Sequence, residues 1–162
     1  MSFKHQALVQ RIRSELGDLD RAVAAVQRHW KRAASESADQ DAFLNSVALN
    51  LHGFYNALER VMELIAVDLD GAALGGEAWH SELLRQVALE MPSLRPAVIS
   101  EGTRQSLDEY RRFRHRVRNI YAANLNVSQL EPLVSRLAGV WTTLKAELAG
   151  FADYLASLTA DG

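Results

Sequence analysis

The sequence predicts an all-α protein, an up-and-down helical bundle of four long helices plus a short one. Apolar residues recur at steps of three and four along most of the 162 residues, which is the period of amphipathic helices. The sequence shows neither the alternating pattern of strands nor a repeat of fixed length. A chain of this length suffices for one core, so we expect a single domain over residues 1–162.

The first two predicted helices cover residues 3–34 and 40–69. A short polar segment separates them, and Ser37 or Asp39 within it can cap the second helix. The broad apolar face of the second helix predicts a central position in the bundle. A polar line runs along the same helix, and we expect its members to lie in solvent: Asn50, His52, Asn56, Glu59 and Glu63.

A glycine-containing connection over residues 70–76 leads to a short predicted helix over residues 77–91, which Pro92 ends. This helix carries His80. A histidine without a second histidine or cysteine at ligand spacing is more often a packing or surface residue than a metal ligand. We therefore expect no metal site at His80.

The fourth and fifth predicted helices follow a linker over residues 93–100. Ser100 or Thr103 can cap the fourth helix, and Asn126 or Ser128 can begin the fifth. The fifth helix shows the longest apolar stripe in the chain, so it needs an equally long helix as its partner.

Composition excludes several classes of function. With no cysteine in the chain, a disulfide framework and a thiolate metal site are excluded. A net charge of −2 argues against a general nucleic-acid coat protein, which would be basic throughout. We find no signal peptide, no apolar run that could span a membrane, and no phosphate-binding or catalytic loop motif. The expected protein is cytoplasmic, without a membrane segment and without a cofactor.

The main candidate for a functional site is the cationic segment over residues 110–121, which holds five arginines. Asp108 and Glu109 precede Arg111 and Arg112 by three residues each, a spacing typical of surface ion pairs on a helix. Three further arginines have no acid nearby in the sequence: Arg114, Arg116 and Arg118. Considered alone, the segment fits a site for an anion about as well as it fits a solvated face.

The same segment also resembles a family motif. Arg114, four intervening residues, Asn119, one more residue and Tyr121 resemble the Arg-x4-His-x-Tyr motif of HepT-like ribonuclease toxins of the HEPN superfamily. The stretch over residues 51–60 and the predicted order of the helices are similar to that family as well. The one departure is Asn119, which stands where the family has histidine.

The resemblance implies a fold, an activity and partners. It implies a HEPN-like helical homodimer that cleaves RNA without a metal ion, with Arg114 binding phosphate and Asn119 at the position of the catalytic base. Arg111 and Arg118 flank Arg114 and would contribute to RNA binding. The implied partner is an MNT-type nucleotidyltransferase antitoxin, which transfers AMP to the tyrosine at the position of Tyr121.

Asn119 leaves three readings open, because an amide does not exchange protons at neutral pH. The first is a toxin, in which Asn119 is either natural or introduced and His115, four residues earlier, is a second candidate base. The next is a catalytically silent HEPN module that binds RNA or a partner protein through its arginines. The last is a purely structural bundle. Loss of general acid–base catalysis costs about 10²- to 10⁴-fold in rate.

Overall fold

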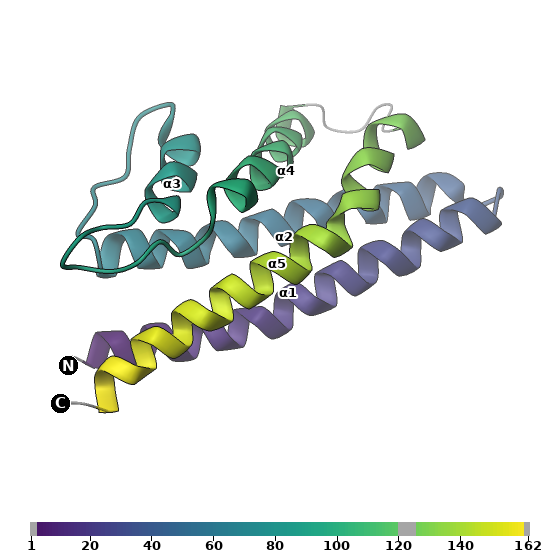
Figure 1. Cartoon of the computed structure of the whole chain (residues 1–162). Coiled ribbons are helices and arrows are strands. Elements are labelled where there is room, and N and C mark those ends of the chain that lie inside the picture. The colour runs from purple at the N-terminus through teal and green to yellow at the C-terminus, as the bar shows by residue number, and fades with distance from the viewer. Residues whose placement is uncertain (1–2, 120–125, 161–162) are drawn as a thin grey trace.

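The computed structural model describes residues 3–119 and 126–160, and its helices confirm the predicted all-α fold (Figure 1). Four helices are long and one is short: α1 (Phe3–Ser35), α2 (Gln40–Asp68), α3 (Trp79–Ala88), α4 (Glu101–Asn119) and α5 (Val127–Ala160). No strand occurs within these ranges. None of the helices in them is both long and apolar enough to cross a membrane.

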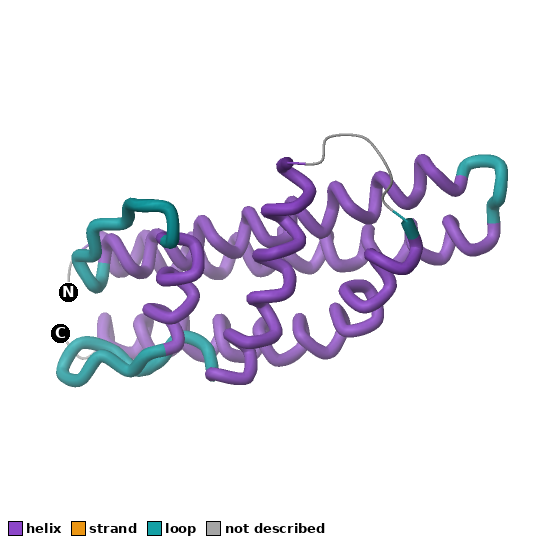
Figure 2. Tube along the Cα trace, turned by 90° about the horizontal axis from the view of Figure 1, so that it is seen from above, coloured by secondary structure: helices purple, strands orange, loops and turns teal. Residues whose placement is uncertain are grey.

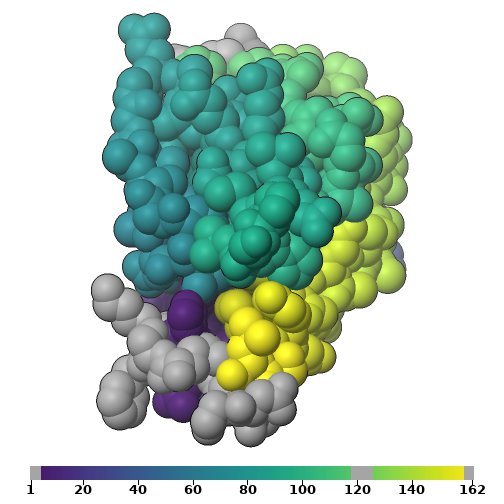
Figure 3. Space-filling view, turned by 60° about the vertical axis from the view of Figure 1, so that its left-hand side comes forward, coloured from purple at the N-terminus to yellow at the C-terminus, as the bar shows by residue number. Residues whose placement is uncertain are grey.

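The three longest helices form the body of the molecule, and α3 and α4 lie across it. α1 and α2 make an antiparallel hairpin, and α5 packs along α1 (Figure 1). Seen from above, α4 runs from α5 to α2, with its C-terminal end beside α2 (Figure 2). α3 packs against α2 and α4, and the linker after it lies next to the C-terminal part of α5 (Figure 3). The C-terminal half of α4 therefore faces α2 and α3.

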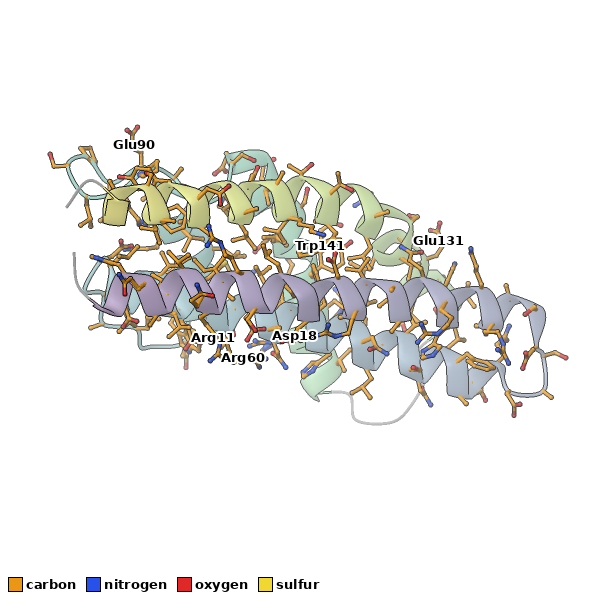
Figure 4. The ribbon with its side chains drawn as sticks, turned by 90° about the horizontal axis from the view of Figure 1, so that it is seen from below. Arg11, Asp18, Arg60, Glu90, Glu131 and Trp141 are labelled. Carbon is orange, nitrogen blue, oxygen red and sulfur yellow. The ribbon has the colours of Figure 1, made fainter. Side chains whose placement is uncertain are left out.

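An aromatic cluster joins the helices at the centre of the core. Phe54 of α2 makes edge-to-face contacts with Tyr110 of α4 and Trp141 of α5, at centroid distances of 6.1 and 5.8 Å. All three side chains are buried. The Trp141 indole points toward α1 (Figure 4), where its Nε1 donates to Asp20 Oδ1 at 2.7 Å. These contacts explain why α2, with the broadest apolar face, occupies the central position.

The predicted helix caps are confirmed at α4 and α5. The Ser100 hydroxyl accepts a hydrogen bond from the Thr103 backbone N–H at 3.2 Å, and Asn126 Oδ1 accepts one from the Gln129 N–H at 3.1 Å. Glu147 of α5 reaches the same end of α4, because its carboxylate accepts from the Ser100 backbone N–H and the Thr103 hydroxyl, each at 3.0 Å. The start of α4 is therefore fixed on α5.

A buried arginine helps to hold the linker between α3 and α4. Arg95 donates with Nε and Nη2 to the two carboxylate oxygens of Asp70, each at 2.7 Å. Its remaining N–H groups donate to the carbonyls of Gln86, Leu89 and Pro96 at 3.0–3.1 Å. All five N–H groups of the guanidinium are thus paired, and the side chains of Arg95 and Asp70 are almost fully buried. This ion pair fixes the linker to the end of α2.

Candidate functional site

The candidate site is built around Arg114, on the side of α4 that faces α2. Tyr110 and Phe113 are buried on that side, and Arg114 follows them by four residues and one. The helical period therefore places Arg114 at the edge of the apolar stripe. Although it is charged, Arg114 is only 7% exposed. Burial of a guanidinium requires partners of opposite charge or hydrogen-bond acceptors.

The partners of Arg114 come from α2. Its Nη1 donates to Glu59 Oε1 at 2.5 Å and to Asn56 Oδ1 at 2.9 Å. Its guanidinium carbon lies 5.4 Å from the centre of the Tyr55 ring, within the range of a cation–π contact. Because Tyr55 and Glu59 are four residues apart and Asn56 lies between them, all three can reach the same guanidinium.

The third helix contributes His80. Its Nδ1 lies 2.8 Å from Glu59 Oε2, and its two ring nitrogens lie 3.1 and 3.4 Å from Arg114 Nη2. The ring stacks on Trp79 at a centroid distance of 3.7 Å. Glu59 thus shares its carboxylate between a guanidinium and an imidazole. Glu59 is 4% exposed, whereas the His80 side chain is 27% exposed. The group is therefore accessible from the His80 side.

A second carboxylate lies close to this group. The pKa of Glu63, one turn after Glu59 on α2, is raised by its partial burial and by the charge of Glu59. His80 and Arg114 act on it in the opposite direction. Among the described residues, no three histidine, aspartate or glutamate side chains are arranged to hold a metal ion.

A family model places the chain among known proteins. The model for HepT-like proteins matches residues 46–155, about two thirds of the chain. The chain belongs to the HepT-like family. No curated protein and no solved structure matches it. The matched range contains every residue of the group around Arg114 in this HepT-like protein.

The structure corrects the expectation for the polar line of α2. Glu59 was expected in solvent but is buried against Arg114, because α4 lies across α2 at this point. Asn56 also contacts Arg114, and it links the site to His52, whose Nδ1 lies 3.1 Å from Asn56 Nδ2. The sequence did contain one signal. Glu59 directly follows the buried Leu58, at the edge of the apolar face, where a charge needs a partner.

The expectation for His80 holds in part. The residue does pack, because its ring stacks on Trp79. Its acidic partner, however, is Glu59, which lies 21 positions away in the sequence, rather than an acid on its own helix. Because this contact joins α3 to α2, the spacing of residues within α3 does not indicate it.

The other cationic residues fall into two groups. Arg111 and Arg112 both donate to Asp108, so both form ion pairs on the helix as predicted. The partner of Glu109 differs from the prediction, because Glu109 pairs with Arg136 of α5 instead of Arg112. Burial would raise the pKa of Asp108, and the two guanidinium hydrogen bonds outweigh it and lower that pKa.

The remaining predicted site residues lie toward the C-terminal end of α4. His115 and Arg116 have exposed side chains. Arg118 and Asn119 close the described part of α4, and their side chains are outside the description, whereas Tyr121 lies outside the described residues altogether. The structure therefore brings Arg114 together with Glu59 and His80 and leaves the roles of Arg111, Arg118, Asn119 and Tyr121 as predictions.

Arg95 and Arg114, both buried in this HepT-like chain, differ in how many of their guanidinium N–H groups have hydrogen-bond partners. Arg95 has a partner for each of its five N–H groups. Arg114 does not, because its buried Nε has no hydrogen-bond partner, and the nearby Tyr55 hydroxyl is also buried without one. Incomplete satisfaction of buried polar groups is costly and concentrates at functional sites. Arg95 has the features of a structural arginine, and Arg114 those of a site residue.

Tyr55 and Tyr110 form a matched pair that tests this difference. We expect Tyr55→Phe to raise the free energy of unfolding at pH 7 by about 1 kcal/mol, because it removes a buried hydroxyl without a partner and keeps the ring beneath Arg114. Tyr110→Phe should lower it by about 1 kcal/mol, because the Tyr110 hydroxyl donates to the Leu133 carbonyl at 2.7 Å. Urea denaturation measures both. Equal losses in the two variants would contradict the assignment.

Tyr55→Phe should also change how stability depends on pH in alkaline solution. Burial raises the pKa of Tyr55, and the charge of Glu59 raises it further. The unfolded chain therefore loses the tyrosine proton first, from about pH 10 upward, and stability falls as pH rises above that value. Tyr55→Phe should make this fall shallower in urea denaturation between about pH 9 and 11. An unchanged slope would contradict the raised pKa.

Proposed function

We propose that this HepT-like protein is a metal-independent endoribonuclease toxin that acts on RNA in the cytoplasm as a homodimer. The observation that supports the proposal best is the buried Arg114, whose guanidinium shares the Glu59 carboxylate with His80. A cation that stabilises a phosphate and an imidazole that transfers a proton are groups that cleavage of RNA by a 2′-hydroxyl can use, and here both contact one carboxylate.

Arg114 has the chemistry to stabilise the scissile phosphate. A guanidinium stays charged at any physiological pH and offers parallel N–H groups that fit phosphate oxygens as they fit a carboxylate. Charge increases on those oxygens in the transition state, and a fixed cation in a partly dehydrated site stabilises them strongly. Membership of the HepT-like family supports placing Arg114 in this role.

The partners belong to the same proposal. The density of arginines in the cationic segment supports Arg111 and Arg118 as flanking RNA contacts. The resemblance of the motif supports Tyr121 as the residue to which an MNT-type nucleotidyltransferase antitoxin transfers AMP. A phosphodiester-linked negative charge at Tyr121 would compete with RNA for the arginines. In this scheme the modified toxin no longer binds its substrate.

A second candidate function follows from Asn119 and from the hydrogen bonds of Arg114. An amide at the base position takes no proton, and Arg114 Nη1 is already engaged by Asn56 and Glu59. Both observations favour a silent module that binds RNA or a partner protein through the arginine face without cutting.

RNA cleavage in the presence of EDTA distinguishes the two functions. We expect the wild-type chain to cut a mixed RNA, Asn119→His to cut faster, and Arg114→Lys to lose about 100-fold or more, because lysine keeps the charge but not the fork. Arg136→Ala is the matched control, since Arg136 is an exposed arginine paired only with Glu109 in the described contacts.

If neither the wild-type chain nor Asn119→His cuts RNA, the ribonuclease proposal is wrong. A loss of RNA affinity in Arg114→Lys, measured by fluorescence anisotropy, would then identify the silent module.

A further inference from the structure

We propose that His80 is the catalytic base of this site, the group that takes the proton from the attacking 2′-hydroxyl. The inference rests on the proposed ribonuclease function, and it supplies the proton transfer that Asn119 cannot perform. Its starting point is geometric. The imidazole of His80 contacts the buried Arg114 and the buried Glu59 at the same time.

The contact with Glu59 determines which nitrogen of His80 carries the proton. An ionised carboxylate only accepts hydrogen bonds, so the 2.8 Å contact to Glu59 Oε2 requires a proton on His80 Nδ1. In the neutral imidazole the other nitrogen, Nε2, then carries the lone pair. A carboxylate that orients a histidine through Nδ1–H in this way is the arrangement that prepares Nε2 to act as a base.

The same assignment leaves Arg114 with capacity for an anion. Because His80 Nδ1 carries a proton, it cannot accept a hydrogen bond from Arg114 Nη2, in spite of their separation of 3.1 Å. Nη2 has two N–H groups, and its contacts among the described residues are with the His80 ring alone. At least one N–H therefore remains for a phosphate oxygen on the side where His80 is exposed.

The fixed position of the ring supports the role. Stacking on Trp79 at 3.7 Å restrains the imidazole plane, and 27% exposure of the side chain gives a substrate access to it. The 2′-hydroxyl and the phosphate that it attacks are on neighbouring carbons of the same ribose. The base must therefore lie within a few ångströms of the cation that binds the phosphate. His80 and Arg114 meet this requirement.

The electron and proton transfers balance without a further reactant. His80 Nε2 takes the 2′-hydroxyl proton, and the 2′-oxygen forms a bond to phosphorus. The bond from phosphorus to the 5′-oxygen breaks, and that oxygen takes a proton from water, while His80 returns its proton to solvent. The products are a 2′,3′-cyclic phosphate and a 5′-hydroxyl end.

Other groups that carry charge face His80. Glu59 and Glu63 approach from α2 and Arg114 from α4. The matched control is His29 of α1, whose ring contacts Ser46 and Phe43 of α2.

The test is cleavage of RNA in EDTA by the wild-type chain and by His80→Gln, His80→Ala and the control His29→Ala. We expect both His80 variants to lose about 10²- to 10⁴-fold in rate and the control variant to stay within about threefold. Added imidazole should restore part of the activity of His80→Ala and none of that of Arg114→Lys, an effect that a purely structural role of His80 would not produce.

The same experiment distinguishes the loss of the base from misfolding and from damage to the rest of the site. Gln at position 80 can still donate to Glu59, so His80→Gln should keep the circular dichroism spectrum and melting temperature of the wild type. The double variant Asn119→His/His80→Gln should cut RNA, which shows that the rest of the site is intact.

Two outcomes would overturn the inference and leave the ribonuclease function standing. The first is cleavage by His80→Gln within threefold of the wild type, and the second is cleavage by Asn119→His but not by the wild-type chain. If no variant cuts, Asn119→His included, the proposed function fails, and the role of His80 fails with it.

Discussion

Arg95→Ala is expected to lower the free energy of unfolding by about 3–5 kcal/mol, the usual cost of removing one partner of a buried ion pair. The substitution leaves Asp70, whose side chain is fully buried, with an unpaired charge. It also removes the donors to three linker and helix carbonyls, at Gln86, Leu89 and Pro96. Urea denaturation measures the loss, and for a chain of this size the melting temperature should fall by about 10 °C.

Arg136→Ala is the control for this prediction. Arg136 pairs with Glu109 at 2.6 Å on the surface, where both side chains are exposed, so its loss should change stability by less than about 1 kcal/mol. Arg95→Lys should restore only part of the loss, because an ammonium offers three donors and cannot bridge both Asp70 oxygens in a planar fork. If Arg95→Ala is no more destabilising than Arg136→Ala, Arg95 does not hold the linker.

The helices of this HepT-like chain could be predicted because their signals are local. Each apolar stripe lies within one element, and a cap such as Ser100 lies next to the turn that it caps. The orientation of α4 could not be predicted in this way, because it depends on contacts between elements. Asp70 shows the limit. The sequence marks it only as the start of a glycine-containing connection, whereas its partner Arg95 is 25 residues away.

The residues of the candidate site also differ in whether a local signal in the sequence indicates them. Arg114 could be found from the density of cations with no acid nearby in the sequence, and Asn119 and Tyr121 from the resemblance of the motif. The pairing of Arg114 with Glu59 and His80 could not be predicted, because these residues reach Arg114 from positions 55 and 34 residues away. The long reach of a guanidinium makes such pairings invisible to a search for neighbours at helical spacing.

Glu59→Met is expected to lower the free energy of unfolding by about 3–5 kcal/mol, because it leaves the guanidinium of Arg114 buried without a counter-charge. Arg114→Met should cost less, since Glu59 keeps His80 as a hydrogen-bond partner at 2.8 Å. The double variant should return to within about 1 kcal/mol of the wild type, because apolar residues of similar volume often replace a buried ion pair without loss.

A double-mutant cycle in urea measures these terms, and the pair of Asp70 and Arg95 provides the comparison. Asp70→Leu/Arg95→Met should stay unstable, because Arg95 also satisfies three backbone carbonyls that no apolar side chain can serve. Arg114 donates to no backbone carbonyl among its described contacts, which are all with side chains. A stable Glu59→Met/Arg114→Met protein would therefore mean that folding does not require this ion pair, which leaves ligand chemistry as the reason for a buried cation. A double variant that stays as unstable as Glu59→Met would instead make Arg114 a structural arginine like Arg95 and remove the main support for a site at this position.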